Sequence, residues 1–487
     1  MSKRRPEFRR SAAKTAEPEP LHVDQIESGR ALAFVVLQQY DATGRFVADL
    51  LAEFDSEHNL SRQQRSQAID VAAGTIRRRR TIDVLLHSQV KRPRAEVEPD
   101  LWRILQTGVQ QLCFGRTPDH AAVDATVELT RSLGRDRWSG FVNGVLRNIT
   151  RLLGDDNSME PAKNNVPIVD GVYRHLNADV FSCPLTSPVE HLGEAFSMPR
   201  AIARRWHQRL TRSDMLAAGF HSLNPPKTGM RVNVLRASVS GVTEALTAAE
   251  VISEPGVYDE SLRLESAGRI DRLPGYEEGH WSIQDESAMA ASRMLNPQPG
   301  EMILDLCAAP GGKTTHLAEL SGDQATIYAC DVNEGRLKRI DSNIARLQLS
   351  SVLSRLVERD GTGLPQLEFD AALVDVPCSN TGVLGRRSEA RWRFNETDLK
   401  ELTQMQGRLL MTAFDLLRPG GRLVYSTCSI EPEETSDLIR SVVESVPSMV
   451  LLKEQLSLPG QPSDGAYTAL IHRVTKPTEG LVREPML

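Results

Sequence analysis

The stretch that most clearly indicates chemistry is LDLCAAPGGKTTHLAEL, residues 304–320, in which an apolar run ends in a glycine turn and a lysine. A triphosphate-binding loop needs a glycine, four further residues and then Gly-Lys-Ser/Thr. Gly312, Lys313 and Thr314 match its end, but the position of its first glycine is Cys307, and no dinucleotide GxGxxG is present either. The turn therefore predicts a different ligand, which approaches the backbone closely at the carboxyl end of a strand.

Two acidic residues follow later strand-like runs. Asp331 ends ATIYACD, 20 residues beyond Gly311, and an acid at that spacing in a doubly wound fold accepts hydrogen bonds from ribose hydroxyls. Asp360, in RDGTGLP, follows a third candidate strand and is expected to contact an adenine edge. Either residue alone is more typical of a helix cap or a turn. Together they favour a nucleoside cofactor that needs no phosphate site, and S-adenosylmethionine fits that description.

Strands and helices that would position these residues alternate from about residue 276 onwards. The strand-like runs are EMILDLC, ATIYACD, FDAALVD and GRLVYSTC. Between them lie segments such as LKELTQMQGRLLMTAFDLL, whose Leu and Met positions share one helical face. This alternation predicts a parallel sheet with helices on both faces.

Residues 24–153 show helical apolar spacing without alternating strand runs, which predicts an all-α domain. Four consecutive arginines, Arg77 to Arg80, would point all round a helix and are expected to be exposed. They would either contact nucleic acid phosphates or form a solvated helix end. The predicted divisions of the chain are a disordered tail 1–20, a helical domain 21–153, a linker 154–190, a small α+β subdomain 191–275, an α/β domain 276–473 and a C-terminal tail 474–487.

A chain of 487 residues is too long for a single core. Residues 1–153 carry 24 Lys and Arg against 19 Asp and Glu, or +5, whereas the remainder carries 34 against 45, or -11. This asymmetry suits a polyanion-binding appendage on an enzyme, or is a chance imbalance of solvated surfaces. No run approaches the roughly 20 apolar residues of a membrane span, and the N-terminus lacks the apolar core of a secretory signal. We therefore expect no membrane partner and a cytoplasmic location.

The six cysteines are scattered and form no CxxC pair, which argues against a disulfide scaffold and against a structural zinc site. They are Cys113, Cys183, Cys307, Cys330, Cys378 and Cys428.

Four blocks of the α/β region resemble successive motifs of the RNA 5-methylcytosine methyltransferases. They are LDLCAAPGGKTTHLAEL, YACDVNEGRLKRI, ALVDVPCSNTGVLGRRSEARW and GGRLVYSTCSIEPEET. Upstream, DHAAVDATVELT and GFVNGVLRNI resemble the NusB-like RNA-binding domain of bacterial small-subunit ribosomal RNA enzymes in this family. The resemblance extends from about residue 24 to residue 473. It implies a NusB-like helical domain, a small α+β subdomain and a Rossmann-like class I methyltransferase domain with a mostly parallel seven-stranded sheet.

The resemblance also implies a role for two cysteines. Carbon 5 of cytosine is a poor nucleophile until a thiolate adds to carbon 6. Enzymes of this RNA family attack with the cysteine of a Thr-Cys motif, here Cys428, so Cys378 in DVPCS is expected to help release the product. Asp375 is expected to accept a hydrogen bond from the exocyclic amine of cytosine, which uracil lacks. Each also has a structural alternative: a small buried side chain for Cys428 and a turn cap for Asp375.

The motifs further imply a binding site for S-adenosylmethionine and contacts with ribosomal RNA, in a protein expected to be a monomer that needs no metal. Arg386, Arg387, Arg391 and Arg393 would either hold the RNA backbone near a flipped base or be solvated. The sequence departs from the family pattern at Val376 and at Asn380, which stands where many relatives carry a small residue. The residues expected to bind the cofactor are Cys307, Ala308, Ala309, Pro310, Gly311, Gly312, Lys313, Asp331, Asp360 and Asp375.

The sequence leaves three functions open. The first is cytosine-5 methylation of small-subunit ribosomal RNA, and the second is the same reaction on transfer RNA or another RNA. The third is a ribosome-assembly factor that binds RNA without catalysis. Two cysteines and the uninterrupted Pro-Gly-Gly-Lys turn weigh against the third, because a binding module needs no pair of thiols.

Overall fold

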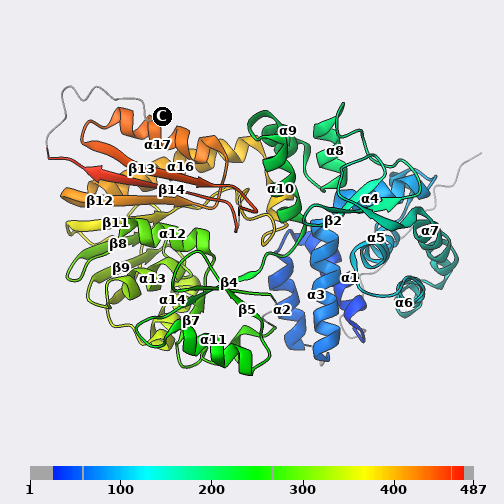
Figure 1. The fold of residues 1–487 in the computed structure, drawn as a ribbon, viewed down its shortest axis with the longest axis horizontal. Helices are drawn as coiled ribbons and strands as arrows, with labels where there is room; N and C mark the ends of the chain where they lie inside the picture. Colours follow the sequence, from blue (N-terminus) through cyan, green and yellow to red (C-terminus); the bar gives the residue numbers. More distant parts are fainter. Residues whose placement is uncertain (1–25, 58–59, 266–267, 462, 476–487) are drawn as a thin grey trace, which may run out of the picture. The chain divides into compact units, whose positions relative to one another are not determined.

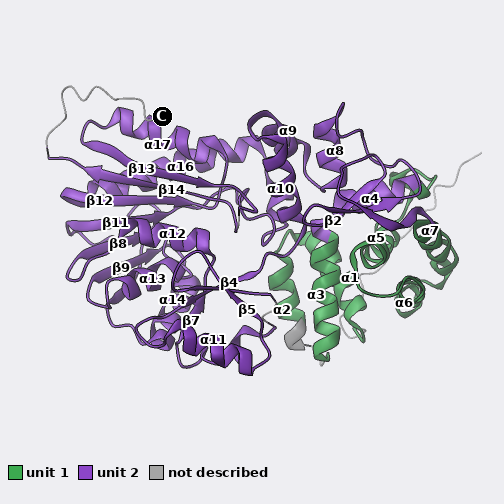
Figure 2. Cartoon of the chain, viewed as in Figure 1, with its two compact units in different colours: residues 1–75, 89–150 green, residues 76–88, 151–487 purple. Residues whose placement is uncertain are grey.

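The computed structural model describes residues 26–57, 60–265, 268–461 and 463–475 (Figure 1). The chain forms two compact units, of which the first comprises the residues up to 75 together with 89–150, and the second comprises 76–88 and 151 onwards (Figure 2). The predicted disordered tail, 1–20, and all but the first two residues of the predicted C-terminal tail, 474–487, lie outside the described residues.

The first unit is built from helices, as the apolar spacing predicts. Its α5 packs against both α1 and α6, and the side chains of Leu101, Ile104 and Leu105 on α5 are buried. Both α3 and α7 run two residues into the second unit. The helices are α1 (Gly29–Thr43), α2 (Val47–Glu57), α3 (Arg62–Arg77), η2 (Arg94–Glu96), α5 (Pro99–Phe114), α6 (Asp119–Ser132), η3 (Asp136–Trp138) and α7 (Ser139–Leu152).

The second unit begins with structure where the sequence predicts a linker. Residues 153–176 form an antiparallel sheet of order β1-β3-β2, made of β1 (Leu153–Ser158), β2 (Asn165–Val169) and β3 (Val172–Leu176). Val169 pairs with Val172 across Asp170 and Gly171, and Gly171 has φ 72°. Asp-Gly is a strong signal for a two-residue hairpin turn, and it lies here within a segment rich in Asn and Pro.

The expectation that Arg77 to Arg80 are exposed is wrong. None of the four is exposed, and Arg78 is buried, with 3% of its surface accessible to solvent. Arg78 donates hydrogen bonds to the carbonyl oxygens of Pro167 (2.7 Å) and Ile168 (2.8 Å), so β2 satisfies its guanidinium. The run belongs to the second unit, spans the end of α3 and the start of α4 (Arg79–Gln89), and is not a solvated helix end.

A small α+β region follows, and its four-stranded antiparallel sheet has the order β5-β6-β4-β7. Its last strand, β7 (Trp281–Ile283), lies beyond the predicted boundary at residue 275, because three residues are too few to show an alternating pattern. The other elements are α8 (Pro188–Ala195), α9 (Arg200–Arg209), α10 (Arg212–Leu223), β4 (Thr228–Val232), α11 (Val239–Ala248), β5 (Ser253–Pro255), β6 (Ser261–Leu264) and η4 (Ile270–Arg272).

The α/β part contains a seven-stranded sheet of order β10-β9-β8-β11-β12-β14-β13. The first five strands in that order are parallel to one another. β14 pairs antiparallel with both of its neighbours, β12 and β13 (Figure 1). Its four central strands are the four runs predicted from the sequence, so the predicted mostly parallel sheet is confirmed. The strands are β8 (Met302–Leu306), β9 (Thr326–Asp331), β10 (Val352–Leu356), β11 (Phe369–Asp375), β12 (Leu417–Thr427), β13 (Met449–Ser457) and β14 (Ala466–Arg473).

Helices cover both faces of this sheet because the buried strands present apolar side chains on both sides. On β8, Ile303 joins the core beneath α12, α13 and α14, whereas Leu304 joins the core beneath α16 and α17. Strand alternation therefore divides the apolar residues between two cores. The helices are α12 (Glu286–Leu295), α13 (Gly312–Leu320), α14 (Glu334–Leu347), α15 (Ala390–Arg393), α16 (Glu396–Asp415), η5 (Pro432–Glu434) and α17 (Ser436–Ser445).

A buried ion pair joins the small sheet to the helix that follows the glycine turn. Arg231 of β4 is fully buried, and its Nε and Nη2 donate to the Glu319 carboxylate of α13 at 2.8 Å and 2.7 Å. Its Nη1 also donates to the carbonyl oxygen of Gly312 (2.8 Å). Both charges are thus desolvated and depend on each other.

Removing one partner of this pair is expected to destabilise the fold. Glu319→Gln leaves the Arg231 charge buried without a counter-charge, which typically costs about 3 kcal/mol or more. The double replacement Arg231→Met with Glu319→Met removes both charges and is expected to recover most of that loss. Urea unfolding of the parent, of Glu319→Gln and of the double variant measures these differences in unfolding free energy. A Glu319→Gln variant as stable as the parent would show that the pair does not join the two elements.

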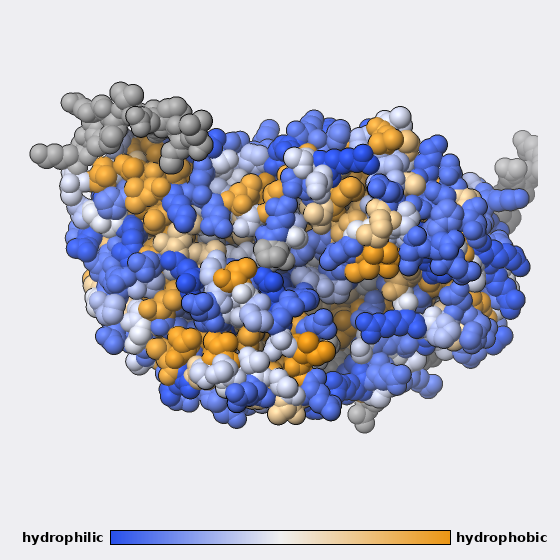
Figure 3. Space-filling model, in the orientation of Figure 1, coloured by the Kyte–Doolittle hydropathy of each residue, from blue (hydrophilic) through white to orange (hydrophobic). Residues whose placement is uncertain are grey.

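Among the described residues, no helix is long and apolar enough to cross a membrane. On the face shown in Figure 3, hydrophilic surface predominates and hydrophobic surface is divided into separate groups.

Candidate active site

The candidate residues gather at the carboxyl ends of three neighbouring parallel strands. The chain order of the strands reverses between β8 and β11, and ligands of open α/β sheets bind outside the carboxyl ends at such a point. Cys307 follows β8, Asp375 ends β11 and Cys428 follows β12. Cys378 lies three residues beyond the end of β11. The strand order thus brings together residues that are far apart in the sequence.

Two residues of the glycine turn after β8 have left-handed backbone conformations. Cys307 has φ 66° and Gly311 has φ 97°, a region that glycine adopts without strain. Gly311 is the N-cap of α13, and a Cβ on it would lie 3.2 Å from Cγ1 of Ile340. The first backbone N–H groups of α13 have no acceptor within the helix and lie at the sheet's switch point, which suits the carboxylate of a bound cofactor.

Asp331 is buried against this turn. Its carboxylate accepts hydrogen bonds from the backbone N–H of Ala309 (3.1 Å) and of Asn333 (3.0 Å), and only 3% of the residue is exposed. It therefore supports the turn, while a contact with ribose stays a prediction. Asp360 is exposed and accepts from the backbone N–H of Thr362 (2.9 Å), so its contact with adenine also stays a prediction.

Lys313 and Asp375 form an ion pair at the switch point, with 2.7 Å between Nζ and Oδ2. Burial alone would lower the pKa of Lys313. The attraction and hydrogen bond of Asp375 outweigh burial, so the pKa of Lys313 is raised and its ammonium stays charged. Asp375 is half-buried, and Lys313 engages only one of its two oxygens. The ion pair fixes the Asp375 carboxylate near the cysteines, while a hydrogen bond from a substrate to its other oxygen stays a prediction.

Cys378 and Cys428 are in direct contact, with 2.9 Å between their sulfur atoms. Both are half-buried free thiols. Because one sulfur donates its proton to the other, the pKa of one thiol falls and that of its partner rises. In this arrangement the hydrogen bond from Cys428 lowers the pKa of Cys378, and the same hydrogen bond and burial raise the pKa of Cys428. The two cysteines therefore act as one proton-sharing pair.

Close backbone packing holds the two cysteine loops together. The backbone N–H of Gly382 donates to the carbonyl oxygen of Cys428 (2.9 Å). A Cβ at Gly382 would lie 2.7 Å from that oxygen, so only glycine fits there. The sequence interpretation did not single out Gly382, although its place in the SNTG run after Cys378 marks a turn.

Glu434 is a second residue that the sequence interpretation did not single out. It is fully buried, and its carboxylate accepts hydrogen bonds from the backbone N–H of Ser379 (2.9 Å) and from Nε2 of Gln406 (2.9 Å). The Ser379 hydroxyl also donates to it. Glu434 thus fixes the residue that follows Cys378. The signal was the acidic run EPEE shortly after the Thr-Cys motif.

Two of the four arginines expected near RNA have structural roles. Arg391 is fully buried and donates to carbonyl oxygens, the closest being that of Ser222 at 2.6 Å. Burial, and then the charges of Arg77 and Arg78, lower the pKa of Arg391 to about 9. Its other acceptors are the carbonyl oxygens of Arg77, Ser197, Leu384 and Ser388.

Arg386 is likewise engaged, because it forms ion pairs with Asp464 and, at 2.7 Å, with Asp285. Arg391 is therefore not a solvated side chain, and Arg386, although exposed, is held by two carboxylates. Arg387 and Arg393 are exposed, and an RNA contact for them stays a prediction.

The remaining cysteines of the turn region are poor nucleophiles. Burial raises the pKa of both Cys307 and Cys330 to about 12, so both stay protonated. The hydroxyl of Thr186 and neighbouring backbone N–H groups lower the pKa of Cys183 to about 7, but Cys183 lies between β3 and α8 and not at a strand end of the large sheet. In the described part of the chain, no group of three or more His, Cys, Asp or Glu side chains is arranged to hold a metal ion.

Asp305 of β8 lies beneath the glycine turn and is fully buried. One carboxylate oxygen accepts from the Thr314 hydroxyl (2.6 Å), and the other has no hydrogen-bond partner. Burial is the main reason why the pKa of Asp305 is raised to about 7. The protonated form is therefore favoured in the folded protein below that pH.

This shift predicts that Asp305 makes stability depend on pH. Its folded pKa of about 7 exceeds the value near 4 of an unfolded aspartate. Its contribution is thus fully present below about pH 4 and is lost as the pH rises through 7. The unfolding free energy of the parent minus that of Asp305→Asn is expected to fall by about 2 to 4 kcal/mol between pH 5 and pH 8. Urea unfolding at both pH values measures this, and a constant difference would contradict it.

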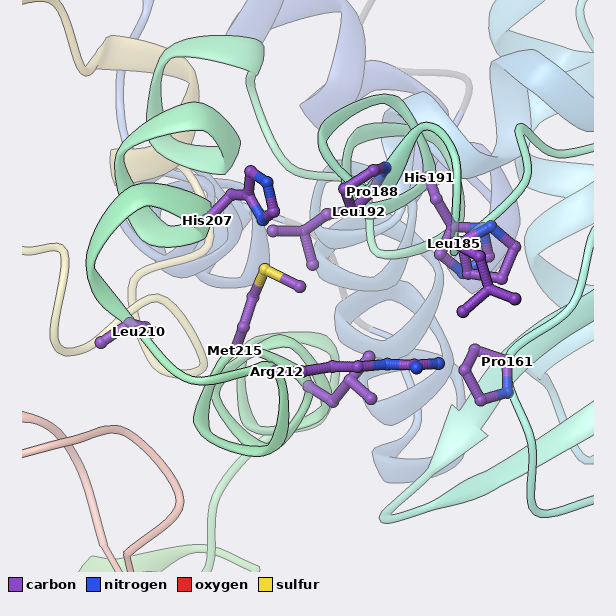
Figure 4. A pocket seen from close by; sticks show the side chains of 11 residues that line it. Pro161, Leu185, Pro188, His191, Leu192, His207, Leu210, Arg212 and Met215 are labelled. Carbon is purple, nitrogen blue, oxygen red and sulfur yellow. The ribbon is translucent and has the colours of Figure 1, made fainter.

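A separate pocket of about 240 Å³ lies among α8, α9 and α10 (Figure 4). Arg212 extends across it, and His207 and Met215 also line it. None of the candidate site residues belongs to its walls, so it is distinct from the cysteine pair.

The strand order, the glycine turn at its switch point and the buried acid beneath that turn define the protein as a Rossmann-like methyltransferase that uses S-adenosylmethionine. The model of the family described as "16S rRNA methyltransferase RsmB/F" matches residues 292–473, and the model of the NusB family matches residues 27–151. The chain belongs to the RsmB/F family, whose members are S-adenosylmethionine-dependent RNA cytosine-C5 methyltransferases.

Two curated relatives resemble most of the chain. The probable ribosomal RNA small subunit methyltransferase B of Synechocystis is 34% identical over 86% of this chain and 89% of that protein. The ribosomal RNA small subunit methyltransferase B of Yersinia pseudotuberculosis is 33% identical over 87% and 91%. Among solved structures, PH0851 covers 93% of this chain and 99% of its own, with a TM-score of 0.68 and 24% identity, which supports the fold.

Proposed function

We propose that this enzyme methylates carbon 5 of a specific cytosine in 16S ribosomal RNA through a covalent bond between Cys428 and the base. The observation that carries the proposal is the contact of Cys378 and Cys428, 2.9 Å apart, at the same strand ends as the glycine turn. The names of the two curated relatives support small-subunit ribosomal RNA as the substrate. The NusB-like region provides an RNA contact in addition to that of the active site. The reaction takes place in the cytoplasm.

Cys428 reacts as a thiolate, after its proton has passed to Cys378 across the contact between the two sulfurs. Its sulfur adds to carbon 6 of the cytosine and forms the S–C6 bond, which places electron density on carbon 5. When bound, S-adenosylmethionine would supply an electrophilic methyl group for carbon 5. The first N–H groups of α13 would hold its carboxylate, and Asp331 and Asp360 would contact its ribose and adenine.

Asp375 selects the base. Lys313 holds one of its carboxylate oxygens, and the other accepts a hydrogen bond from the exocyclic amine of cytosine. Uracil presents a carbonyl oxygen at that position, which a carboxylate repels. The Lys313 ammonium also attracts the negative charge of the Cys428 thiolate.

Cys378 completes the reaction. After Cys378 has released to solvent the proton it took from Cys428, its thiolate removes the proton from carbon 5, the C5–H electrons restore the C5–C6 double bond, and the S–C6 bond breaks to release Cys428 as a thiolate. The proton is then on Cys378, which lies in contact with Cys428. Transfer of that proton to Cys428 returns the pair to its starting protonation, and one proton in all has gone to solvent.

Bisulfite sequencing of total RNA tests the substrate. A deletion strain is expected to lose one protected cytosine of 16S ribosomal RNA, and the parental gene but not its Cys428→Ala variant is expected to restore it. Loss of protection in transfer RNA instead would favour the second candidate substrate. No loss at any cytosine would favour an assembly factor without catalysis.

A further inference from the structure

The pocket among α8, α9 and α10 contains an unpaired cation. Five arginines lie between residues 200 and 212, and four of them form ion pairs with carboxylates, namely Arg200, Arg204, Arg205 and Arg209. The fifth, Arg212, extends across the pocket (Figure 4) and has no ion pair or hydrogen bond with any residue that the structure describes. Among the described residues that line the pocket, none is Asp or Glu. The charge of Arg212 is therefore available to an anionic ligand.

A larger pocket shows that cations in the other pocket walls are paired. It has a volume of about 370 Å³ and is lined by residues of β4 and β6. Its lysine and both of its arginines pair with carboxylates of the same wall: Lys227 with Glu254 (2.9 Å), Arg263 with Glu286 (2.6 Å) and Arg386 with Asp285 (2.7 Å). That pocket satisfies its own charges, whereas the pocket at Arg212 does not.

The wall of the Arg212 pocket also contains an acceptor without a donor. Nδ1 of His191 lies 2.9 Å from the carbonyl oxygen of Ser182, which can only accept, so Nδ1 carries the proton. Burial lowers the pKa of His191, so the ring is neutral and Nε2 is an acceptor. Only 3% of His191 is exposed, and Nε2 has no hydrogen-bond partner among the described residues. Because an unpaired buried polar atom is costly, a ligand that donates to it gains binding energy.

The rest of the wall is largely apolar and suits a flat ring. Leu185 lines the pocket although 71% of it is exposed, and Leu192, Met215 and three prolines line it as well. His207 adds an imidazole on which a base can stack. The volume of about 240 Å³ is below the roughly 300 to 1,000 Å³ of pockets for larger ligands. A single nucleotide supplies what this wall requires, which is an apolar ring, an N–H donor and a phosphate.

Helix α9 lies between this pocket and the loop of the proposed nucleophile. Arg209 donates to the carboxylate of Glu431 (2.9 Å), three residues beyond Cys428. His207 lines the pocket and lies two residues before Arg209, about 200° around the helix and so on its opposite face. One helix, about 10 Å across with its side chains, thus separates the two sites. A single RNA strand can span both.

We propose that this pocket binds one nucleotide of the RNA strand that enters the active site. Its phosphate pairs with Arg212, its base packs on the apolar wall, and an N–H of the base donates to Nε2 of His191. The proposal rests on the proposed function in taking RNA as the substrate. A free mononucleotide has the same chemistry, so the experiment includes one.

Binding of a short labelled single-stranded RNA to the full-length protein, measured by fluorescence anisotropy, tests this. Arg212→Met keeps an apolar chain but removes the charge. It is expected to weaken binding about tenfold and to lower the salt slope by about one. Arg212→Lys is expected to keep most of the affinity. Arg200→Met is the matched control, because it removes an arginine of α9 that does not line the pocket, and it should bind as the parent does.

Equal affinities of Arg212→Met and Arg200→Met would overturn the proposal. Circular dichroism checks that each variant is folded. Should Arg212→Met unfold, Leu185→Glu decides instead, because it places a negative charge at an exposed position of the wall and is likewise expected to weaken binding. A Leu185→Glu variant with parental affinity would then overturn the proposal.

Calorimetric titration with adenosine monophosphate distinguishes a free nucleotide from a strand. Binding that Arg212→Met abolishes, together with an unchanged affinity for RNA, would assign the pocket to a free nucleotide and overturn the proposed strand contact. The readouts need no methyl transfer. If the binding results are as expected but no RNA is methylated, the proposed function fails while the nucleotide pocket stands.

Discussion

Cys428→Ala is expected to abolish methyl transfer to 16S ribosomal RNA, with a loss of roughly 10⁴-fold or more, as when an enzyme nucleophile is removed. Without the sulfur, carbon 6 cannot be attacked and carbon 5 remains too poor a nucleophile to accept the methyl group. Cys378 lies only 2.9 Å away, but its loop follows a different strand, so it is not expected to substitute. Transfer of a radiolabelled methyl group to undermodified small-subunit RNA measures the rate.

Cys183→Ala provides the matched control. Cys183 is a free cysteine whose pKa is lowered to about 7, but it lies between β3 and α8. Its removal is expected to leave the rate unchanged. If Cys428→Ala retained even a tenth of the parental rate, the covalent mechanism would be wrong.

Cys378→Ala is expected to stop the reaction after the methyl group has reached carbon 5. The S–C6 bond breaks only when the proton on carbon 5 is removed, and this variant lacks the thiolate proposed to remove it. A protein–RNA adduct should therefore accumulate. It should survive denaturing electrophoresis, because the S–C6 bond is covalent.

The control combines both changes. The variant Cys378→Ala with Cys428→Ala is expected to form no adduct, since it lacks the attacking sulfur. If Cys378→Ala released product at the parental rate and Cys428→Ala instead accumulated the adduct, the roles of the two cysteines would be the reverse of those proposed.

Much of the fold was predictable because the large sheet imposes strong local patterns. The runs that became β8, β9, β11 and β12 are apolar and end in turns or polar residues, as buried parallel strands do. The antiparallel sheet of residues 153–176 was missed because its strands are short and rich in polar residues. Its Asp170-Gly171 hairpin turn was the available signal.

Arginine burial was the main feature that could not be predicted. A guanidinium is expected at the surface unless it is paired, and a sequence does not show which backbone carbonyls will surround it. Arg78 and Arg391 find such carbonyls in distant segments, whose positions depend on the folded chain. The same argument explains why a run of four arginines was expected to be exposed.

The candidate site was predictable in its parts but not in its contacts. Motif resemblance singled out Cys378, Cys428 and Asp375, and the strand order accounts for their proximity. It did not indicate that the two sulfurs lie 2.9 Å apart or that Lys313 pairs with Asp375. Such contacts depend on side-chain directions at the ends of strands that are far apart in the sequence.

Trapping the parent enzyme on RNA that contains 5-fluorocytidine tests the central claim most directly. Fluorine replaces the proton on carbon 5, so release is blocked after the sulfur has added, and the base stays attached to the protein. Mass spectrometry of the digested adduct identifies the attached residue. The account predicts the nucleotide on Cys428; attachment to Cys378, or no adduct at all, would contradict it.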